Sequence, residues 1–477
     1  MTKKYIIGVD GGSQSSKVTI FDLEGNVICQ GKQDLKPMYL ADPCIAEHPD
    51  DDLWDSLIVA CRQAMDAFTG DPKDIIGVGI CTIRCCRVLM KKDGNLAAPA
   101  ISWMDLRIAR PYEHDVPDVG YVTTTTGYIT HRFSGKLVDT VANLVGEWPV
   151  DTDKWQWSDD PEVFKKYNLP REMLLDVEVP GTIAGYVTKE AARLTGIPEG
   201  IPVVTTASDK AVEALGTGLV TDDAVLVSLG TYICGMAKGY RNVTDAKSFW
   251  TNMACMPHEY LYESGGIRRG MWTVSWFKNL LGGDIEASAK EAGISEEEYL
   301  ELLARDVPAG SNGLMTVLDW LAPPSETFRK GLFIGFDGRH GRGHMYRSIL
   351  EAIALTMKGH VEGMVNELGM KPKKVIVSGG GSNSDLFMQI FADTFGMKAE
   401  RNVVNGAAGL GSAICVAVAV GAYPDFISAT QKMVRIKDSF DPIAENVDLY
   451  QHMYTDVYQS LRDDVAPILK KSHEIFG

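Results

Sequence analysis

The sequence predicts an α/β protein with two domains that face each other across a deep cleft. The chain has 477 residues, which is more than a single hydrophobic core usually serves. Three glycine-rich segments follow predicted strands, near residues 11, 230 and 380, so they are spread over the whole chain. We therefore expect one domain over residues 1–245, a second over residues 246–477, and a ligand that is held from both sides.

The amino-acid composition limits the kinds of molecule that this protein is expected to bind. The hydrophobic content of 45% and the charged content of 23% are typical of a soluble globular protein. The formal net charge is -16, and such a surface repels the phosphates of nucleic acids and of anionic membranes, so we expect neither as a partner. The nine cysteines lack the spacing of a disulfide framework, and the N-terminus enters a strand pattern without a signal sequence, which indicates a cytoplasmic protein.

The first segment, "YIIGVDGGSQSSKVTIFDLEGNVICQG", predicts three strands joined by two turns. A P-loop carries a glycine directly before its lysine and leads into a helix. Here Lys17 follows a run of hydroxyl residues, and the β-forming stretch "VTIF" comes after it. "LEGN" predicts a turn, after which a strand resumes. A P-loop and a dinucleotide-binding fingerprint are therefore both excluded.

A β-hairpin of this composition can still hold phosphate. Gly12 lets the backbone approach a ligand closely, and Ser13 and Lys17 offer a hydroxyl and a positive charge. Asp10 ends the first strand beside them, where it could hold a magnesium ion through water. The alternative is a polar hairpin with Asp10 as a turn residue, and these residues alone leave both interpretations open.

Two further strand ends carry glycine. In "AVLVSLGTYICGMAKG" a strand runs into Gly230 and Thr231, and a second strand follows. In "KKVIVSGGGSNSDLFMQIFADTFG" a strand ends in a glycine run that includes Gly380 and Gly381, Ser382 can cap, and an amphipathic helix begins. Three glycine-bearing strand ends indicate that one nucleotide is bound from several sides. This is the pattern of the actin-like (ribonuclease H-like) ATPase fold.

At these motifs the sequence resembles the FGGY family of carbohydrate kinases, in a branch similar to xylulokinase and glycerol kinase. The resemblance runs through nearly the whole chain and includes "GVDGGSQSSKVTIFDLEG", "AISWMDLR", "TTASDKAVEALG", "VSLGTY" and "VSGGGSNSDLFMQIFADTFG". It implies a kinase that transfers the γ-phosphoryl group of ATP, with Mg²⁺, to a hydroxyl of a sugar, polyol or sugar acid. It also implies a homodimer and two domains that close on each other, for which residues 237–250 are the expected hinge.

The resemblance assigns roles to individual residues. Asp209 becomes the general base and, with Asp10, a metal-linked carboxylate; from the residues alone, Asp209 could instead cap the helix that it opens. The phosphates would bind to Gly12, Ser13, Lys17, Gly230 and Thr231, and the adenosine to Gly380, Gly381 and Ser384. The substrate would contact Arg84, Trp103, Asp105, Asp209 and Lys210.

The substrate side departs from the family pattern. "CTIR" stands where relatives often carry a glutamine before the sugar contact, and Lys210 stands where an amide is usual. Arg84 and Lys210 together favour, as a hypothesis, an acidic or a densely hydroxylated sugar. Trp148, Trp155 and Trp157 could stack on a sugar, but packing against the core of the first domain is the favoured interpretation.

Two other functions are compatible with the same fold. One is a nucleotide-dependent switch or chaperone, but the sequence shows no added peptide-binding module. The other is a degenerate kinase that binds its ligands without turnover, which the intact Asp10, Asp209 and Gly230-Thr231 motifs argue against. Formation of ADP that depends on a sugar would distinguish the enzyme from both.

Overall fold

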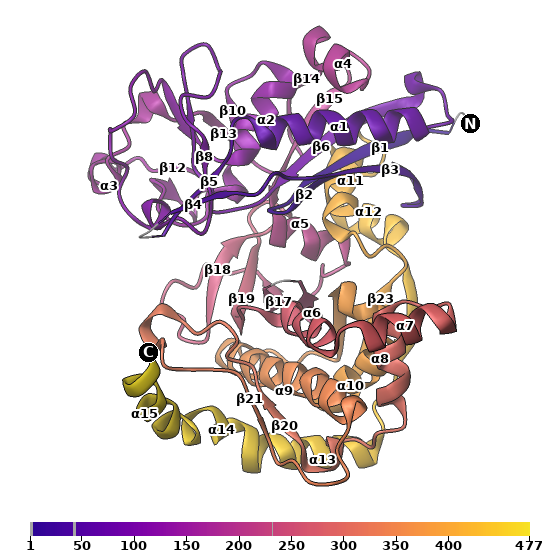
Figure 1. Ribbon diagram of the computed structural model, residues 1–477. Coiled ribbons are helices and arrows are strands. Elements are labelled where there is room, and N and C mark those ends of the chain that lie inside the picture. The colour runs from indigo at the N-terminus through magenta and orange to yellow at the C-terminus, as the bar shows by residue number, and fades with distance from the viewer. Residues whose placement is uncertain (1–2, 42–43, 231) are drawn as a thin grey trace.

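The structure is a computed structural model that describes residues 3–41, 44–230 and 232–477. Two mixed β-sheets form two lobes, which lie one above the other in Figure 1. The first sheet has the spatial order β14-β15-β6-β1-β2-β3. Its strands are β14 (Ile183–Tyr186), β15 (Pro202–Ser208), β6 (Ile75–Thr82), β1 (Tyr5–Gly11), β2 (Ser15–Asp22) and β3 (Val27–Asp34).

The second sheet repeats this topology, with the spatial order β18-β19-β17-β16-β22-β23-β24. Its strands are β18 (Phe249–Met253), β19 (Tyr260–Ile267), β17 (Ile233–Gly239), β16 (Ala224–Leu229), β22 (Lys374–Gly379), β23 (Lys398–Asn402) and β24 (Ile436–Phe440). In each sheet antiparallel strands lead to a central strand, two parallel strands follow, and an antiparallel strand closes the edge. The second sheet has one additional antiparallel strand, and β17 pairs in it with β19, so that β18 lies at the edge. The repeated order confirms the predicted two-lobed α/β architecture.

The first three strands form the meander that the sequence predicts. Strand β1 pairs antiparallel with β2, and β2 with β3. Asp10 lies directly opposite Lys17 in this register. Residues that lie opposite each other project to the same face of a sheet, so the acid and the base share one face at the strand end.

Helices cover the outer faces of both sheets. Helix α1 (Asp52–Ala67) lies along β2 and β3 of the first sheet, and α9 (Arg342–Leu368) lies along β19 and β17 of the second (Figure 1). Each turns an apolar stripe inward, with Trp54 of α1 and Ile353 of α9 fully buried.

The smaller elements fill in around these layers. The further helices are α2 (Thr125–Ser134), α3 (Pro161–Tyr167), α4 (Lys189–Thr195), α6 (Gly270–Leu281), α7 (Gly283–Ala292), α8 (Glu296–Arg305), α10 (Asp385–Phe395), α12 (Phe426–Met433), α13 (Ala444–Met453), α14 (Gln459–Asp464) and α15 (Ala466–Phe476). The short strands are β4 (Tyr39–Ala41), β5 (Ile45–His48), β7 (Val88–Met90), β8 (Ala100–Ile101), β9 (Tyr121–Thr123), β10 (Val138–Thr140), β11 (Val150–Asp151), β12 (Gln156–Trp157), β13 (Asp176–Glu178), β20 (Met315–Val317) and β21 (Leu332–Ile334). Among the described residues, no helix has the length and apolar character that crossing a membrane requires.

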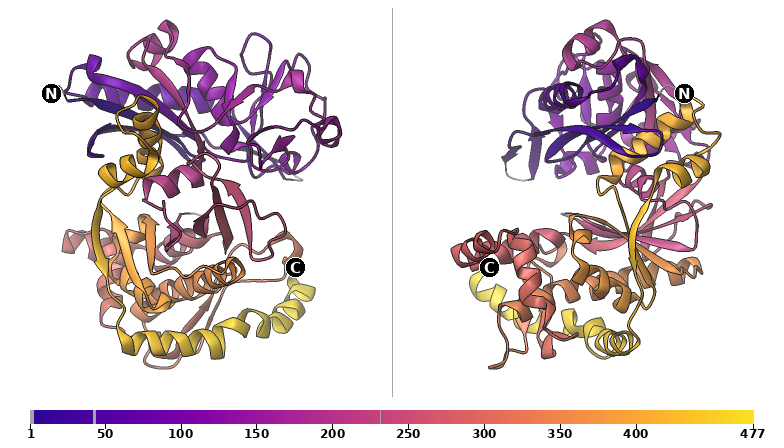
Figure 2. Two further views of the ribbon diagram at one scale, coloured as in Figure 1. Left: turned by 180° about the vertical axis from the view of Figure 1, so that it is seen from behind. Right: turned by 90° about the vertical axis from the view of Figure 1, so that its right-hand side faces the viewer.

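Two helices lie between the lobes and pack on each other (Figure 2). Helix α5 (Asp209–Gly216) follows β15, and α11 (Ala407–Ala419) comes from late in the chain yet packs on β1 and β6 of the first sheet. A Cβ atom at Gly216 would lie 1.9 Å from the carbonyl oxygen of Ala407, and one at Gly411 would lie 2.1 Å from that of Val212. Glycine at both positions therefore allows the two helix backbones to touch.

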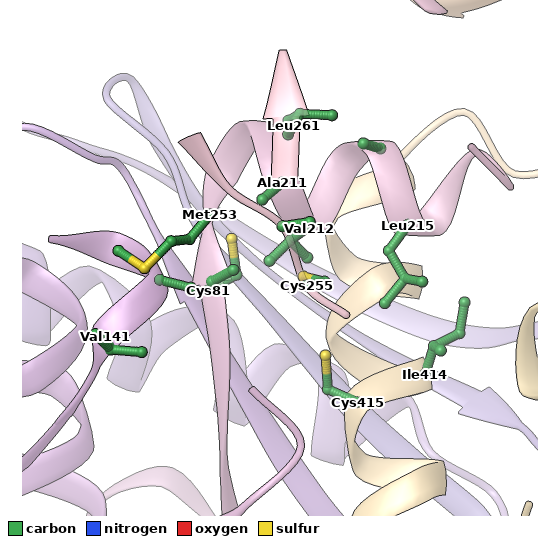
Figure 3. Close-up of a cluster of buried hydrophobic side chains, with 14 of the residues drawn as sticks. Cys81, Val141, Ala211, Val212, Leu215, Met253, Cys255, Leu261, Ile414 and Cys415 are labelled. Carbon is green, nitrogen blue, oxygen red and sulfur yellow. The ribbon is translucent and has the colours of Figure 1, made fainter. Parts of the chain in front are cut away.

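The core around these helices is shared by both lobes. Figure 3 shows Val212 of α5 and Ile414 of α11 in the same cluster as Leu261, which belongs to the second sheet. These side chains are almost completely excluded from solvent. The same cluster, which continues into the second sheet, buries Trp148, Trp155 and Trp157. Their predicted role in packing is therefore confirmed.

The connections between the lobes differ from the sequence-based expectation. The chain passes between the sheets at residues 217–223, and again at residues 403–406 and 434–435 on either side of α11 and α12. The expected hinge at residues 237–250 is wrong, because this segment joins β17 to β18 within the second sheet. The division into residues 1–245 and 246–477 stays a prediction; the second sheet takes its strands from Ala224 onward, and α11 returns to the first lobe.

Replacing Gly411 by alanine tests the backbone contact between α5 and α11. In an exposed helix this change stabilises by about 1 kcal/mol, because glycine is a poor helix former. Here the new methyl group would meet the Val212 carbonyl oxygen at 2.1 Å, so we expect a loss of about 1–3 kcal/mol in the free energy of unfolding. Urea denaturation measures the difference. Gly283→Ala, at the start of α7 with open space around it, is the matched control and should cost nothing; a stabilised Gly411→Ala variant would contradict the contact.

Candidate active site

Asp209 stands at the first turn of α5, between the two lobes. Ser208 caps this helix, since its Oγ accepts a hydrogen bond from the backbone N–H of Ala211 at 3.4 Å. The interpretation of Asp209 as the helix cap is therefore wrong. Its Oδ1 atom is buried, yet it accepts no hydrogen bond from any residue that the structure describes. A buried oxygen without a donor is costly, which makes Asp209 a candidate for contact with a ligand.

An arginine–glutamate pair from opposite lobes lies beside Asp209. Arg84 follows β6 of the first sheet, and Glu263 lies on β19 of the second. Arg84 NH1 donates to Glu263 Oε2 at 2.6 Å, and NH2 donates to Oε1 at 2.7 Å. Arg84 Nε lies 3.7 Å from Asp209 Oδ1, so its charge also faces that carboxylate. The three side chains form one electrostatic unit across the lobe interface.

A second network fixes the next turn of α5. Lys210 Nζ donates to Glu213 Oε2 at 2.9 Å and to the Ser228 hydroxyl at 2.8 Å. The Ser378 hydroxyl in turn donates to Glu213 Oε1 at 3.0 Å. Ser228 belongs to β16 and Ser378 to β22, so this network binds the start of α5 to the second sheet.

Burial and charge shift the pKa values of the two acidic residues that the sequence assigns to chemistry. Burial raises the pKa of Asp209 above its ordinary value, while the charges of Arg84 and Lys210 oppose the rise. Burial raises the pKa of Asp10 to about 6; Lys17 opposes this, and the Asp209 carboxylate adds to it. The Asp209 carboxylate is thus one of the charges that act on Asp10.

The first hairpin places its polar groups at the same end of the first sheet. The backbone N–H of Gly12 donates to the Ser15 carbonyl at 3.0 Å and closes the turn, with Ser13 partly exposed within it. Lys17 points toward the start of α11, where a Cβ atom on Gly406 would lie 3.8 Å from Nζ. The hairpin thus keeps Lys17 beside Asp10 at the lobe interface.

The other two glycine segments end strands of the second sheet. Gly230 follows β16, and a Cβ atom there would lie 3.4 Å from the carbonyl oxygen of Tyr232. Thr231 lies outside the described residues, and its predicted role stays a prediction. Gly380 and Gly381 form a short 3-10 turn after β22, and no atom lies within 4 Å of the position of a Cβ on Gly380.

The cap of the following helix differs from the prediction. Ser384, not Ser382, caps α10, because its Oγ accepts the Phe387 N–H at 3.1 Å. Ser382 instead donates to the Gly379 carbonyl at 2.8 Å. The 3-10 turn delays the start of α10, so the expected cap at Ser382 is wrong.

Two predicted substrate residues lie in a different set of contacts. Asp105 is buried and accepts hydrogen bonds from the Ala46 N–H at 2.7 Å and from the backbone and guanidinium of Arg107. These bonds satisfy its carboxylate and order the loop. Trp103 beside it is 47% exposed. The structure brings neither residue into contact with Asp209 or Arg84, and their roles in substrate binding stay predictions.

Sequence reasoning missed Glu263 and its neighbour Asn252, whose Nδ2 donates to Glu263 Oε2 at 3.3 Å. The only local signal is a carboxylate inside the otherwise strand-like segment "YLYESGGI", which a buried strand tolerates when it is paired. The partner, Arg84, lies 179 residues earlier in the chain. Glu213, one turn further along α5, is the counter-ion of Lys210.

The donor set is compatible with magnesium held together with a nucleotide. Within the described part of the chain, no group of three or more His, Cys, Asp or Glu side chains forms a cage for a metal ion. Mg²⁺ commonly keeps several waters and binds through one or two carboxylates plus substrate phosphates. Asp10 and Asp209, with the unpartnered Oδ1 atom, fit that requirement.

Comparisons with known proteins agree on one family. The N-terminal domain model of the FGGY family of carbohydrate kinases matches residues 5–115 and 108–216, and the C-terminal domain model matches residues 225–420. The chain is 52% identical over 475 residues to the uncharacterized sugar kinase YgcE of Escherichia coli K12, covering 100% of this chain and 96% of that protein. It is 26% identical over 515 residues to the autoinducer-2 kinase of the same strain, covering 97% and 95%.

Solved structures share the fold. Xylulose kinase from Rhodospirillum rubrum matches with a TM-score of 0.82 at 23% identity, covering 98% of this chain and 100% of that chain. Gluconate kinase from Lactobacillus acidophilus matches with a TM-score of 0.83 at 18% identity and the same coverage. The likeness confirms the predicted actin-like, two-domain fold.

Replacing Asp10 by asparagine tests the electrostatics of the site through stability. The folded-state pKa of about 6 lies above the ordinary value of 3.8, so the ionised carboxylate costs folding free energy, and this cost grows as the pH rises through that interval. Asp10→Asn removes the cost. We expect the variant's gain in unfolding free energy to be about 1 kcal/mol larger at about pH 8 than at about pH 5.

Urea unfolding at both pH values measures this gain. Asp222→Asn, at an exposed position before β16, provides the matched control for the change from carboxylate to amide. An Asp10→Asn variant that is less stable than the natural protein at the higher pH would contradict the electrostatic account.

Proposed function

Because the chain belongs to the FGGY family of carbohydrate kinases and is a carbohydrate kinase, we propose that it transfers the γ-phosphoryl group of MgATP to a hydroxyl of a small sugar or polyol, with Asp209 as the general base. The observation that carries the proposal is the unpartnered, buried Oδ1 of Asp209 at the lobe interface. An acceptor hydroxyl would supply the missing donor.

Asp209 suits the role of base by position and by charge. Burial raises its pKa, which strengthens it as a proton acceptor, while Arg84 and Lys210 favour its ionised form. Its place in the first turn of α5 keeps the carboxylate on a rigid element. In the proposed step, the Asp209 carboxylate accepts the proton of the attacking hydroxyl. The new oxygen–phosphorus bond forms, the bond between the γ-phosphorus and the bridging oxygen breaks, and ADP departs.

The phosphate side rests on the hairpin and on the glycine segments. The ammonium of Lys17 would neutralise phosphate charge, and the glycine-bearing turns at Gly12 and Gly230 would lie against the phosphates. Asp10 and Asp209 would hold Mg²⁺, which supplies charge neutralisation between the phosphates. The open space at Gly380 would accommodate the adenosine.

The homodimer and the cytoplasmic location remain predictions.

Asp209→Asn tests the base. The amide keeps the shape of the side chain but cannot accept the proton, so we expect a loss in kcat of about 10²–10⁴-fold. Sugar-stimulated ADP formation measures kcat, and titration with ATP measures nucleotide binding, which should persist. Asp222→Asn again serves as the control, with unchanged turnover. Full sugar-stimulated turnover in Asp209→Asn would contradict the proposal, whereas ATP binding without sugar-stimulated ADP in the natural protein would favour a nucleotide switch.

A further inference from the structure

The guanidinium of Arg84 already forms an ion pair with a carboxylate of this chain. Both terminal nitrogens donate to Glu263, in the two-pronged geometry that an arginine also uses for a bound carboxylate. Glu263 is completely buried, and the charge of that carboxylate, working against burial, holds the pKa of Arg84 above its ordinary value. A carboxylate on a substrate would have to displace Glu263 to obtain the same pairing.

Displacement of Glu263 is unfavourable. The remaining described donor to its carboxylate is the Asn252 amide, at 3.3 Å, so release of Arg84 would leave a buried negative charge without a cation. Breaking one side of a buried ion pair is among the most destabilising changes in a protein interior. Approach from the Nε side meets a second obstacle, because Asp209 Oδ1 lies 3.7 Å from that nitrogen and repels another carboxylate.

The second cation on the substrate side is also paired. Lys210 Nζ is held by Glu213 and Ser228 and thus faces the network of the second sheet. The Asp209 carboxylate adds further negative charge beside Arg84. The two cations that favoured an acidic sugar in the sequence therefore have their counter-ions within the protein.

We propose that Glu263 is a specificity-determining residue of the acceptor site, and that by occupying Arg84 it restricts the acceptor to uncharged polyols and ketoses. The inference rests on the proposed function and names the substrate class of that site. Arginine has five N–H donors, and the pairing with Glu263 leaves others able to donate to neutral hydroxyls without breaking the ion pair. A hydroxyl placed there also lies next to the base, Asp209.

The test compares acceptors of equal length with and without a carboxylate. ADP formation is measured with xylitol, D-xylulose and sorbitol, and with D-xylonate and D-gluconate. For the natural protein we expect kcat/KM for the best neutral acceptor to exceed that for the best aldonate by about 100-fold or more. In Glu263→Gln the guanidinium is freed, and the ratio should move toward the aldonates by about 10-fold or more.

Glu351→Gln is the matched control. Glu351 is also buried in the second lobe and pairs with an arginine, Arg347, at 2.8 Å, but away from the site. It reports the cost of breaking such a pair and should leave the ratio unchanged. If Glu263→Gln does not fold, thermal shifts of the natural protein replace it, and the neutral compounds should raise the melting temperature more than the aldonates do.

The outcomes separate the two proposals. Preference of the natural protein for an aldonate, an unchanged ratio in Glu263→Gln, or a larger thermal shift with the aldonates would overturn the role of Glu263 while leaving the kinase proposal intact. Absence of ADP formation with every acceptor, neutral and acidic, would instead count against the proposed function and against the inference that depends on it.

Discussion

Direct backbone contact between α5 and α11 is the constraint on which the rest of the structure depends. Gly216 and Gly411 let the two helices touch, and a Cβ on Gly8 of β1 would lie 2.0 Å from the carbonyl oxygen of Gly409. Close packing of this kind leaves no room for the helices to slide. Because Asp209 opens α5, the same contact sets where its carboxylate lies relative to both sheets.

Charge pairing governs the site that this packing creates. Arg84 pairs with Glu263 and Lys210 with Glu213, so each cation is compensated where water is scarce. Asp209 Oδ1 departs from the rule, because it accepts no hydrogen bond from a described residue. Buried polar atoms in native proteins usually have a partner, which can also be a water molecule or a ligand. The networks that stabilise the interface thus leave Asp209 Oδ1 without a donor among the described residues.

The Arg84–Glu263 pair connects specificity with the assembly of the two lobes. One partner comes from the first sheet and the other from the second, so the pair forms only when the lobes are together. Under the proposed mechanism, an acceptor would meet a neutralised guanidinium and an ionised base at the same moment. Closure of the two lobes and selection of the acceptor would then depend on one set of contacts.

The sequence by itself determined the local structure and the chemical class of the protein. The β1–β2–β3 meander, the glycine-bearing strand ends and the position of Asp209 after a buried strand follow from residue periodicity and from the special backbone of glycine, and these motifs also carried the family resemblance. Local patterns could not place the cap of α10, because a 3-10 turn at Gly380–Asn383 comes between the strand and the helix.

Only the tertiary structure decided how distant segments combine. It returned α11 to the first lobe, located the connections between the lobes, and brought Glu263 to Arg84 from 179 residues away. The hypothesis of an acidic substrate rested on the positive charges of Arg84 and Lys210. Their counter-ions, Glu263 and Glu213, are brought to them only by folding. The physical reason is that periodicity acts over a few residues, whereas the energy of a buried charge depends on every group that folding places around it.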